Sequence, residues 1–489
     1  MRRVLALALA AGLGCHEVHF ESDVAEGAID IYDHLFAVSA PDERRAVAVG
    51  YYGAVYTTED AGDTWQKRRS GTERLLYDVS MPDAERGWAV GQLGTVLRTK
   101  DGGASWQPQV TSKAEDGFHL FAVHALDANN AWAVGEWGSR IVTEDGGVSW
   151  QDQSLTITLD HPQYVWLNPS EQERVRRGEK VFEDVTLNDV YCRPAPSSRC
   201  WIVGEFGYIF RSDERGLTWE RGEIVGGEKV APIVFQFDST EISEADAARI
   251  KSFISSILDQ EHLNVVIEAF ASPREIAEFT RGGDPNPLFD TLDGRATGVR
   301  SVIEETGILS DRLRMRGTPP WDYEDFLDDD PGFLDRYLQS RRADRPMVVV
   351  EVAQNPYLFR VQFSDDDHGI ITGLGGVVLV SGDGGKTWRY GSTGTKLALY
   401  ALAPRDGQAL AVGEKGVVRA SADGGWHWAP PKEIRFPEVF TFMRDMTFDP
   451  QRRLGLIVGQ RGLVLRSRDQ GKTWERSLPP AGSLAASAS

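Results

Sequence analysis

Short apolar segments separated by turns of one kind make up most of the chain. The repeating unit is an apolar segment ending in Val-Gly, two residues, Gly, a second apolar segment and a polar turn of the type Ser/Thr-x-Asp-x-Gly-x-Thr/Ser-Trp. Short apolar segments bounded by such turns are typical of β-strands. The pattern therefore predicts a mainly β protein. Seven copies of the turn occur, at Thr58–Trp65, Thr99–Trp106, Thr143–Trp150, Ser212–Trp219, Ser381–Trp388, Ser421–Trp428 and Ser467–Trp474.

The composition of the turn suggests a structural role. Its Asp carboxylate accepts backbone N–H groups, its Gly allows a positive φ, and its Trp begins the next strand with a large apolar ring. Only Glu214, in place of Asp, and His427, in place of the hydroxyl residue, depart from the pattern. Seven catalytic or calcium sites are the alternative. Repetition at every unit favours the structural interpretation, because chemistry belongs to unique sites.

The distance between successive turn Trp residues gives the size of the unit. The spacings are 41 (65 to 106), 44 (106 to 150), 69 (150 to 219), 169 (219 to 388), 40 (388 to 428) and 46 (428 to 474). A period of about 43 residues is that of a four-stranded propeller blade. The sequence predicts a seven-bladed β-propeller over residues 34–225 and 355–478, with a short insert at 152–184. In the second unit the expected strands are 76–80, 87–90, 95–99 and 106–110.

The repeats resemble the Asp-box, or BNR, propellers. The string Trp88-Ala89-Val90-Gly91-Gln92-Leu93-Gly94-Thr95-Val96 is similar to the photosystem II stability and assembly factor family. That resemblance implies a non-enzymatic propeller in an exported or lumenal space, which holds a membrane-protein precursor during assembly. It does not imply photosynthesis, because no residue of the chain is specific to chlorophyll proteins.

Sialidases also carry Asp boxes, so a glycoside hydrolase is the enzymatic alternative. Those enzymes need three arginines for the substrate carboxylate, a tyrosine activated by a glutamate, and an acidic proton donor. Their Arg-Ile-Pro signature is absent, and its nearest equivalent is Arg140-Ile141-Val142 inside the third repeat. The enzymatic interpretation is therefore disfavoured.

A second domain is predicted at residues 229–354, within the long spacing. Strands are expected at 233–239, at 263–271, after Arg312 and at 347–352, with helices starting at Ser243 and covering 294–306. The strings Phe235-Gln236-Phe237-Asp238-Ser239, Val265-Val266-Ile267-Glu268 and Arg295-Ala296-Thr297-Gly298-Val299 resemble the C-terminal OmpA-like domain, an α+β fold that binds peptidoglycan.

The resemblance also indicates how that domain differs from its family. An Asp and an Arg clamp the ammonium and carboxylate of diaminopimelate in the family. Here Arg295 is present, but Ser272 stands in place of the acid and offers no charge to an ammonium. The clamp is therefore read as degenerate. A domain that interacts with another ligand is favoured over direct binding of peptidoglycan.

The tips between the second and third strands of each unit form the predicted working face. The long inserts follow units three and four, and in an antiparallel blade such links lie on the same face as the tips, opposite the Asp boxes. Tyr52, Leu93, Trp137 and Phe206 occupy the tips of units one to four, against Gly375, Lys415 and Arg461 in the others. Single exposed apolar residues need no explanation. Four in adjacent units predict a protein-binding arc, with Trp137 and Phe206 at its centre.

The first residues suggest export. The apolar run 4–13 follows Arg2 and Arg3 and is too short to span a bilayer. It ends near Cys15 in a string resembling a bacterial lipoprotein cleavage box, with Gly12 where a larger apolar residue is usual. Lipidated Cys15 is favoured over simple secretion. His16 is not the Asp of inner-membrane retention, so the resemblance implies an outer-membrane lipoprotein with a signal peptide at 1–15, a linker at 16–33 and a flexible tail at 479–489.

The other two cysteines, Cys192 and Cys200, lie at the near ends of two predicted adjacent strands. A disulfide that closes this hairpin is favoured over two buried thiols, since export leads to an oxidising compartment.

Composition narrows the possible ligands. A net charge of −20 argues against nucleic acid. No metal or cofactor is predicted, because the nine histidines are scattered. The acidic residues between Asp322 and Asp330 fit a solvated loop better than a cation site.

The sequence thus predicts a non-catalytic scaffold or assembly factor of the cell envelope that binds an envelope or membrane protein. A linker that tethers the membrane to peptidoglycan is the alternative.

Overall fold

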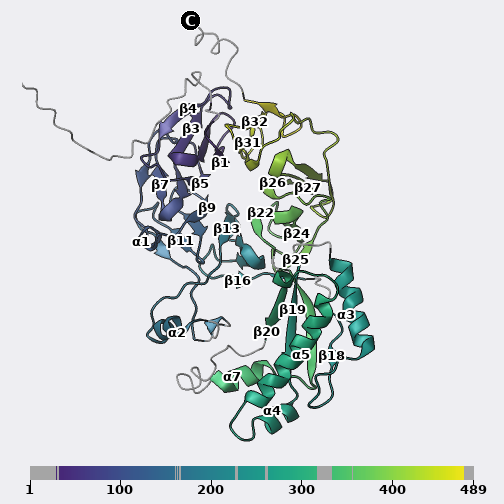
Figure 1. Ribbon diagram of the computed structural model, residues 1–489. Helices are drawn as coiled ribbons and strands as arrows, with labels where there is room; N and C mark the ends of the chain where they lie inside the picture. The colour runs from purple at the N-terminus through teal and green to yellow at the C-terminus, as the bar shows by residue number, and fades with distance from the viewer. Residues whose placement is uncertain are drawn as a thin grey trace, which may run out of the picture.

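The computed structural model describes residues 29, 32–159, 161, 163–164, 167–225, 230–258, 263–316, 333–354 and 356–477. Within them the chain forms a ring of sheets with a separate α/β module on one side (Figure 1). The fold is mainly β and propeller-like, as predicted. Cys15 with its signal peptide, the acidic segment 322–330 and the tail 479–489 lie outside the described residues.

In the described part of the chain, seven antiparallel sheets make up the ring, and each contains four strands that follow one another in sequence. Numbered in chain order, sheet 1 contains β1 (Leu35–Ser39), β2 (Ala46–Gly50), β3 (Ala54–Thr58) and β4 (Gln66–Arg69); sheet 2, β5 (Leu76–Ser80), β6 (Gly87–Gly91), β7 (Val96–Thr99) and β8 (Gln107–Pro108); sheet 3, β9 (Leu120–Ala125), β10 (Ala131–Gly135), β11 (Arg140–Thr143) and β12 (Gln151–Asp152). Sheet 4 contains β13 (Leu187–Cys192), β14 (Cys200–Gly204), β15 (Ile209–Ser212) and β16 (Glu220–Arg221).

The remaining three sheets follow the module in sequence. Sheet 5 contains β22 (Leu358–Phe363), β23 (Gly369–Gly373), β24 (Val378–Ser381) and β25 (Thr387–Tyr390), and β17 (Glu223–Ile224) joins its outer edge in parallel. Sheet 6 contains β26 (Leu399–Arg405), β27 (Gln408–Gly413), β28 (Val418–Ser421) and β29 (Trp428–Ala429); sheet 7, β30 (Met443–Phe448), β31 (Gly455–Gly459), β32 (Val464–Ser467) and β33 (Glu475–Arg476).

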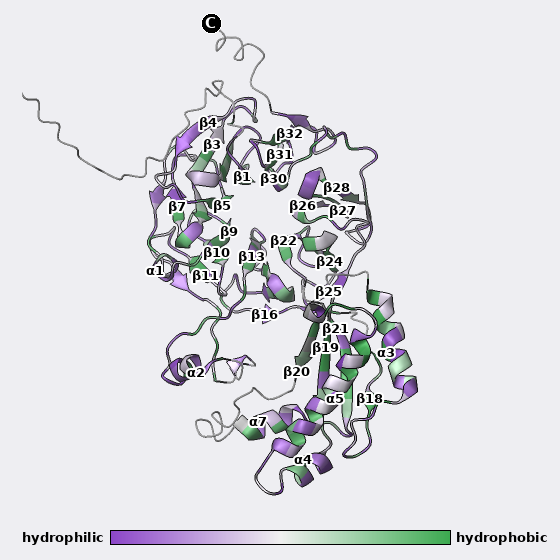
Figure 2. Cartoon of the chain, viewed as in Figure 1, coloured by the Kyte–Doolittle hydropathy of each residue, from purple (hydrophilic) through white to green (hydrophobic). Residues whose placement is uncertain are grey.

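The innermost strands close the ring. Each of the strands β1, β5, β9, β13, β22, β26 and β30 contacts the next, and β30 contacts β1. Sheets 1 and 7 meet where the ring closes, and a backbone hydrogen bond from Gly462 to Asp33 together with side-chain contacts holds this seam. Val38 donates its N–H to Asp445 Oδ2 at 2.9 Å, and apolar residues of both sheets form one buried cluster around Trp65 and Leu456. Figure 2 shows hydrophobic residues on the inner strands of the ring and on the module's β19.

The Asp boxes connect the third and fourth strands of every sheet. In the first box, Asp60 Oδ1 accepts the N–H of Thr64 at 2.9 Å and Oδ2 accepts its hydroxyl at 2.6 Å. Trp106, in the second box, donates its indole N–H to Gly103 O at 3.1 Å. Hydrogen bonds from the side chain and backbone of Ser149 lower the pKa of Asp145 to about 2. These contacts satisfy the carboxylate within its own turn, as the structural interpretation expects.

Each box also packs on the preceding sheet. A Cβ on Gly147 would lie 3.1 Å from the indole nitrogen of Trp88, and one on Gly385 would lie 2.5 Å from that of Trp201. The second glycine of these boxes is therefore needed for two reasons. A side chain there would press on the tryptophan of the preceding sheet, and φ is positive, at 81° for Gly147 and 83° for Gly385. The boxes thus hold neighbouring sheets together.

The module contains a four-stranded sheet with helices packed against it. Its order is β18 (Ile233–Val234), β21 (Met347–Gln354), β19 (Leu263–Phe270) and β20 (Leu313–Arg316), with β20 parallel to β19 and the other pairs antiparallel. The helices are α3 (Glu244–Ile257), α4 (Pro273–Phe279), α5 (Asn286–Glu304) and α7 (Phe333–Ser340). The sequence prediction shortened α5 at its start and lengthened β18, and it missed α4 and α7.

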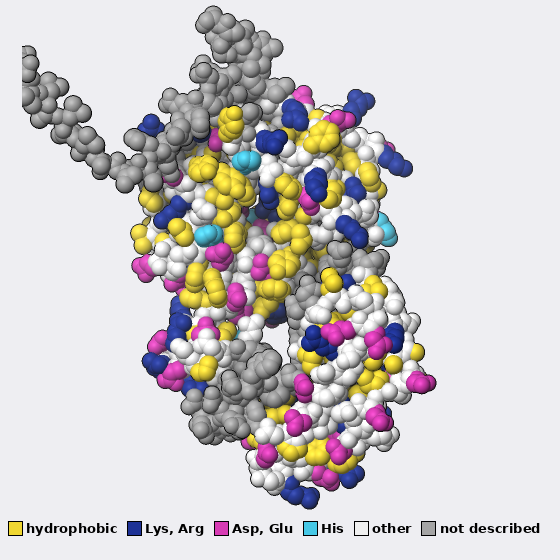
Figure 3. Space-filling view, in the orientation of Figure 1, with side chains coloured by type: hydrophobic (Ala, Val, Ile, Leu, Met, Phe, Trp, Pro, Cys, Tyr) yellow, Lys and Arg dark blue, Asp and Glu magenta, His cyan; other side chains and the backbone are white. Residues whose placement is uncertain are grey.

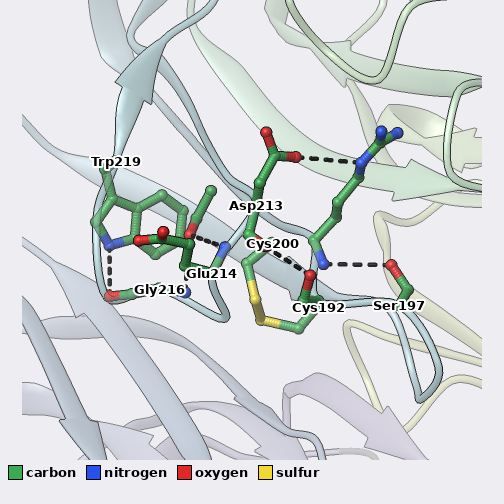
Figure 4. Close-up of a disulfide and its surroundings, with 10 residues drawn as sticks. Cys192, Ser197, Cys200, Asp213, Glu214, Gly216 and Trp219 are labelled. Atoms are coloured by element: carbon green, nitrogen blue, oxygen red, sulfur yellow. Dashed lines mark hydrogen bonds and ion pairs between the residues drawn. A yellow bond between two sulfur atoms is a disulfide. The ribbon is translucent and has the colours of Figure 1, made fainter.

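Two short helices stand in the links of the ring, α1 (Ser112–Asp116) before sheet 3 and α2 (Pro169–Arg176) in the insert between sheets 3 and 4. Cys192 and Cys200 face each other across β13 and β14 and are joined by a disulfide beside the fourth Asp box (Figure 4). None of the described helices is long and apolar enough to cross a membrane.

Candidate functional site

The seven tips share one backbone conformation that is unfavourable for most residues. Each is a two-residue hairpin turn in which both residues have positive φ, the geometry of a type I′ turn. The second residue is always Gly. The first has φ of 52° at Tyr52, 52° at Leu93, 53° at Trp137 and 55° at Phe206. Gly375, Lys415 and Arg461 occupy the same position in sheets 5 to 7, with φ of 67°, 51° and 58°.

This conformation makes the four apolar tips informative. A left-handed backbone costs an L-residue about 1–2 kcal/mol, and large side chains adopt it rarely. Gly375 shows that the turn itself accepts glycine. The large apolar residues therefore carry a backbone cost that glycine would avoid, a situation common at binding sites.

The structure places the four predicted tips on one face, and three of them lie beside another aromatic ring, Tyr52 beside Tyr51 with ring centroids 6.0 Å apart. Tyr52 is 79% exposed, and Leu93, Trp137 and Phe206 are each 43% exposed. Trp137 stacks on Phe118 with ring centroids 6.0 Å apart, and Phe206 lies 5.5 Å from the ring of Tyr357. The two central residues of the predicted arc are thus held in position while nearly half of each remains accessible.

The insert at 152–184 is fixed beside Trp137. Phe182 of the insert meets Phe118 edge to face at 5.3 Å. The fully buried Lys113 lies 4.4 Å from the Phe182 ring and forms ion pairs with Asp116 at 2.7 Å and with Asp152 at 3.3 Å. The insert therefore extends the tip face.

A second feature of this face is a collar of bulged residues around the central channel. In every sheet, the pairing of the innermost strand with the second strand shifts register at the second residue of the innermost strand. The second strand is the one that leads into the tip. A bulge leaves this second residue of the innermost strand outside the ladder and re-aims its side chain. The seven collar residues are Phe36, Tyr77, Phe121, Asn188, Phe359, Tyr400 and Arg444.

The collar surrounds a cavity of about 190 Å³, here called the cup. Tyr77 meets Phe36 and Phe121 edge to face at 5.8 and 4.8 Å. Across the cup, the Arg444 guanidinium lies 4.8 Å from the Tyr400 ring and 5.2 Å from the Phe36 ring. Figure 3 shows hydrophobic side chains gathered around the opening of the ring, with basic side chains inside it.

The residues that follow the bulges form the next layer of the ring, and five of the seven line the floor of the cup. The seven residues are Ala37, Asp78, Ala122, Asp189, Arg360, Ala401 and Asp445, and we call them the central layer. Arg360 contacts Asp189 at 3.3 Å and also contacts Asp445. The carboxylates of the layer also tie sheets together, since Asp78 and Asp189 each accept the N–H of a residue in the next sheet, Val123 and Val361, at 2.8 Å.

The central layer holds more negative charge than positive charge. Burial, only partly offset by Arg360, raises the pKa of Asp78 to about 8 and that of Asp189 to about 6, with Asp445 adding to both shifts. The carboxylates in turn raise the pKa of Arg360 further despite its burial, so it stays charged. Below the layer, a cavity of about 620 Å³ opens on the opposite face, where burial lowers the pKa of His124 to about 4.

Comparison with known proteins gives one family match. The model of the family "Photosynthesis system II assembly factor YCF48" matches residues 65–175, less than a quarter of the chain. No curated protein matches. Similar solved structures include YCF48 bound to D1 peptide (16% identity, 91% of this chain and 95% of that one, TM-score 0.47) and YCF48 from Cyanidioschyzon merolae (16%, 91% and 98%, TM-score 0.36).

A further similar structure is the GH74 xyloglucanase from Xanthomonas campestris, at 12% identity with a TM-score of 0.46, over 93% of this chain and 55% of that one. At TM-scores under 0.5 these structural likenesses support no conclusion about function. The sialidase-like string is itself explained by packing. Arg140 lies between sheets 3 and 4, with its guanidinium 5.3 Å from the Trp219 ring and its Nε donating to Gln153 O at 2.9 Å.

The two residues of the predicted degenerate clamp, Arg295 and Ser272, lie close together, and each already bonds to a residue of the module. Arg295 is fully buried and pairs with Glu275 at 2.6 Å, and it also donates to the carbonyl of Ser239 at 2.8 Å. Ser272 caps α4, accepting the N–H of Glu275 at 3.3 Å. The role of Arg295 in a degenerate wall-binding clamp stays a prediction, and in the structure its guanidinium is paired with Glu275 inside the module.

The collar and the central layer were missed by the sequence analysis. Their signal was present in the repeats, at the two residues after the first apolar residue of each inner strand. Aligning the units on that residue, rather than on the Asp box, brings Asp78, Asp189, Arg360 and Asp445 into one column. Within the described residues, no group of three or more His, Cys, Asp or Glu is arranged to hold a metal ion.

Proposed function

We propose that this chain is a non-catalytic scaffold or assembly factor that binds a polypeptide partner through its tip face, with Tyr52, Leu93, Trp137 and Phe206 as contact residues. The observation that carries the proposal is that four successive sheets keep large apolar residues at a left-handed position where sheet 5 has Gly375. The family match over residues 65–175 supports a protein partner rather than a small substrate, since YCF48, for which that family is named, has been solved bound to D1 peptide.

The test uses glycine substitutions, because glycine fits the turn. Trp137→Gly together with Phe206→Gly removes both rings and relieves two strained residues. We expect photo-crosslinks from the tip face to the partner to disappear in cells, while the melting temperature changes little. Lys415→Gly with Arg461→Gly is the matched control, since it makes the same backbone change and should keep the crosslinks. Crosslinks that persist in the first variant, or that map to the Asp-box face, contradict the proposal.

The fold and location that go with this function are also proposals. The seven sheets are assigned as the blades of a seven-bladed propeller and the module as an OmpA-like domain, supported by the sheet orders and by the strings that resemble that family. Lipidation of Cys15 and an outer-membrane location rest on the sequence alone. Cys15→Ala should release the protein from the membrane fraction, and equal membrane retention would exclude the anchor.

The alternative role, tethering to peptidoglycan, is disfavoured by the buried Arg295–Glu275 pair. Sedimentation of the purified protein with isolated peptidoglycan tests it directly. We expect no co-sedimentation above that of an unrelated acidic protein, and clear binding would restore the tethering role.

A further inference from the structure

The cup combines aromatic walls with a floor layer that holds more carboxylates than guanidinium groups. Asp78 and Asp445 line the cup together with Arg360 and Arg444, and the third carboxylate of the layer, Asp189, lines the cavity on the opposite face. When Asp78 is ionised, the central layer and Arg444 together hold three negative charges against two positive ones. One added cation would balance the site.

Of the three carboxylates in the described central layer, Asp78 is the one that forms no ion pair with a guanidinium group. Arg360 contacts Asp189 and Asp445, whereas Asp78 is held by the backbone N–H groups of Val123 at 2.8 Å and Val79 at 2.9 Å. Asp78 follows Tyr77 directly in the chain and, with Phe121 and Ala122, lines the cup on the side of sheets 2 and 3. The charge deficit is therefore localised beneath two aromatic rings.

We propose that the cup receives one lysine side chain of the polypeptide partner, with its alkyl stem against Tyr77 and Phe121 and its ammonium at Asp78. This inference rests on the proposed function, because it names the chemistry that the partner presents to the tip face. It adds a cation-binding pocket to a surface described so far by its apolar residues.

The walls are suited to a cation as well as to a methylene stem. Arg444 shows this on the opposite side of the cup, where its guanidinium carbon lies within 5.2 Å of the ring centroids of Phe36, Tyr400 and Phe442. Aromatic faces attract ammonium groups, and a lysine stem packs on apolar surface while its head reaches a polar group. A flexible lysine matches the narrow cavity better than the planar guanidinium of arginine.

Binding should depend on pH in a defined direction. Burial raises the pKa of Asp78 to about 8, so the group is mostly protonated at pH 7. An ammonium binds the ionised form, so binding at pH 7 releases a proton. Of the neighbours of Asp78, Arg360 stays charged, burial lowers the pKa of His124 to about 4, and burial raises the pKa of Asp189 to about 6. Burial also raises the pKa of Tyr77 above its usual value. Affinity should therefore rise about tenfold from pH 7 to pH 9, where a lysine still carries its charge.

The experiment compares three capped tripeptides, Ala-Lys-Ala, Ala-norleucine-Ala and Ala-Glu-Ala, for binding to the purified protein by NMR titration at pH 7 and pH 9. The lysine peptide should bind at least tenfold more tightly than the norleucine peptide at pH 9, and this preference should shrink at pH 7. Equal binding of lysine and norleucine peptides makes the cup an apolar pocket. Preference for the glutamate peptide makes Arg444 the binding group. Either result overturns the proposal.

Variants locate the site. Asp78→Asn should abolish the lysine preference and its pH dependence, and Phe121→Leu should weaken binding several-fold without changing the pH dependence. Asp406→Asn makes the same charge change at a residue with a side chain 89% exposed near the cavity on the opposite face, and it should bind like the wild type. Lysine preference retained in Asp78→Asn, or lost in Asp406→Asn, contradicts the assignment.

The two proposals can fail separately. Trp137→Gly with Phe206→Gly should leave tripeptide binding intact while abolishing crosslinks to the partner. If the crosslinks depend on the tips but the lysine peptide does not bind, only the cup assignment is wrong. If the lysine peptide binds but crosslinks map elsewhere, the tip-face function is wrong and the cup remains a cation site.

Discussion

The ring and the inserted module each bury an arginine, but they balance its charge differently. In the module, Arg295 meets one carboxylate, Glu275, at 2.6 Å, and the carbonyls of Ser239 and Gln236 accept its remaining N–H groups at 2.8 and 3.3 Å. In the ring, Arg360 meets Asp189 and Asp445, with Asp78 close enough to affect its pKa. One site is matched in charge and the other is not.

The consequence appears in the carboxylates. Burial opposes the ionisation of Glu275, but the hydrogen bond from Arg295 and those from the backbone lower its pKa overall. Burial raises the pKa of Asp78 to about 8, because the single guanidinium of Arg360 only partly compensates the charges of three carboxylates. A matched pair closes a site to ligands, whereas an unmatched layer leaves a charge deficit that an incoming cation can fill.

The largest expected effect comes from breaking the matched pair. Glu275→Gln keeps the shape of the side chain but leaves Arg295 charged and fully buried, which should destabilise the module by about 3–5 kcal/mol. Thermal or denaturant unfolding measured on the module's helical signal checks this. Glu278→Gln, which removes the partly exposed partner of Arg274 on the same helix, is the control and should change stability by less than about 0.5 kcal/mol. Equal effects of the two variants would mean that the Arg295 pair is not a matched buried pair.

A smaller effect is expected from removing the arginine of the unmatched layer. Arg360→Met leaves the carboxylates without their cation, but Asp78 is already protonated at neutral pH and Asp189 can take up a proton nearby. We expect a loss of about 2–4 kcal/mol at pH 8 and a clearly smaller loss at pH 5. Unfolding followed at both pH values gives the comparison, with Arg405→Met, at the exposed Arg405–Asp406 pair, as control. A loss that does not depend on pH would show that the layer's carboxylates do not titrate as a group.

Asp78→Asn tests the surplus carboxylate itself. The folded state of the wild type holds the Asp78 proton up to about pH 8, whereas an unfolded chain releases it near pH 4. Stability contributed by Asp78 is therefore lost as pH rises from about 4 to 8. Asparagine cannot ionise, so the variant should gain roughly 1–3 kcal/mol relative to the wild type between pH 5 and pH 9. Parallel stability curves for the two proteins would show that Asp78 carries no surplus charge.

The sequence predicted the parts of the structure that depend on contacts between residues close together in the chain. The Asp boxes follow from residues within one turn, as the hydrogen bonds of Asp60 with Thr64 show. Three of the four strands of sheet 2 lie within one residue of their predicted bounds. The fourth, β8, is only Gln107–Pro108.

The parts that were missed depend on long-range contacts. Asp78, Asp189, Arg360 and Asp445 come from four different sheets, and nothing in their immediate neighbours shows that they meet in one layer. Glu275 was missed for the same reason, because α4 was not predicted and its capping box places Glu275 against Arg295, which lies 20 residues further along the chain. The tip residues were predicted from their position in the repeat, but their left-handed backbone became evident only in the structure.

The smallest expected effect converts the matched site into an unmatched one. Ser272→Asp keeps an N-cap residue at the start of α4, since Asp caps as well as Ser does. The Ser272 hydroxyl lies 3.2 Å from Glu275 Oε2, however, so a carboxylate there adds a second acid beside the single Arg295. We expect a loss of about 0.5–1 kcal/mol at pH 7, which disappears at low pH as the added acid protonates.

Unfolding measured at the two pH values checks this. Ser243→Asp, at the exposed N-cap of α3, is the matched control, and its unfolding free energy should stay close to that of the wild type. Co-sedimentation with peptidoglycan should not increase, because the guanidinium of Arg295 remains buried against Glu275. Increased binding would show that Arg295 can turn toward a ligand. The module's arginine site could then accept a charged ligand, as proposed for the central layer.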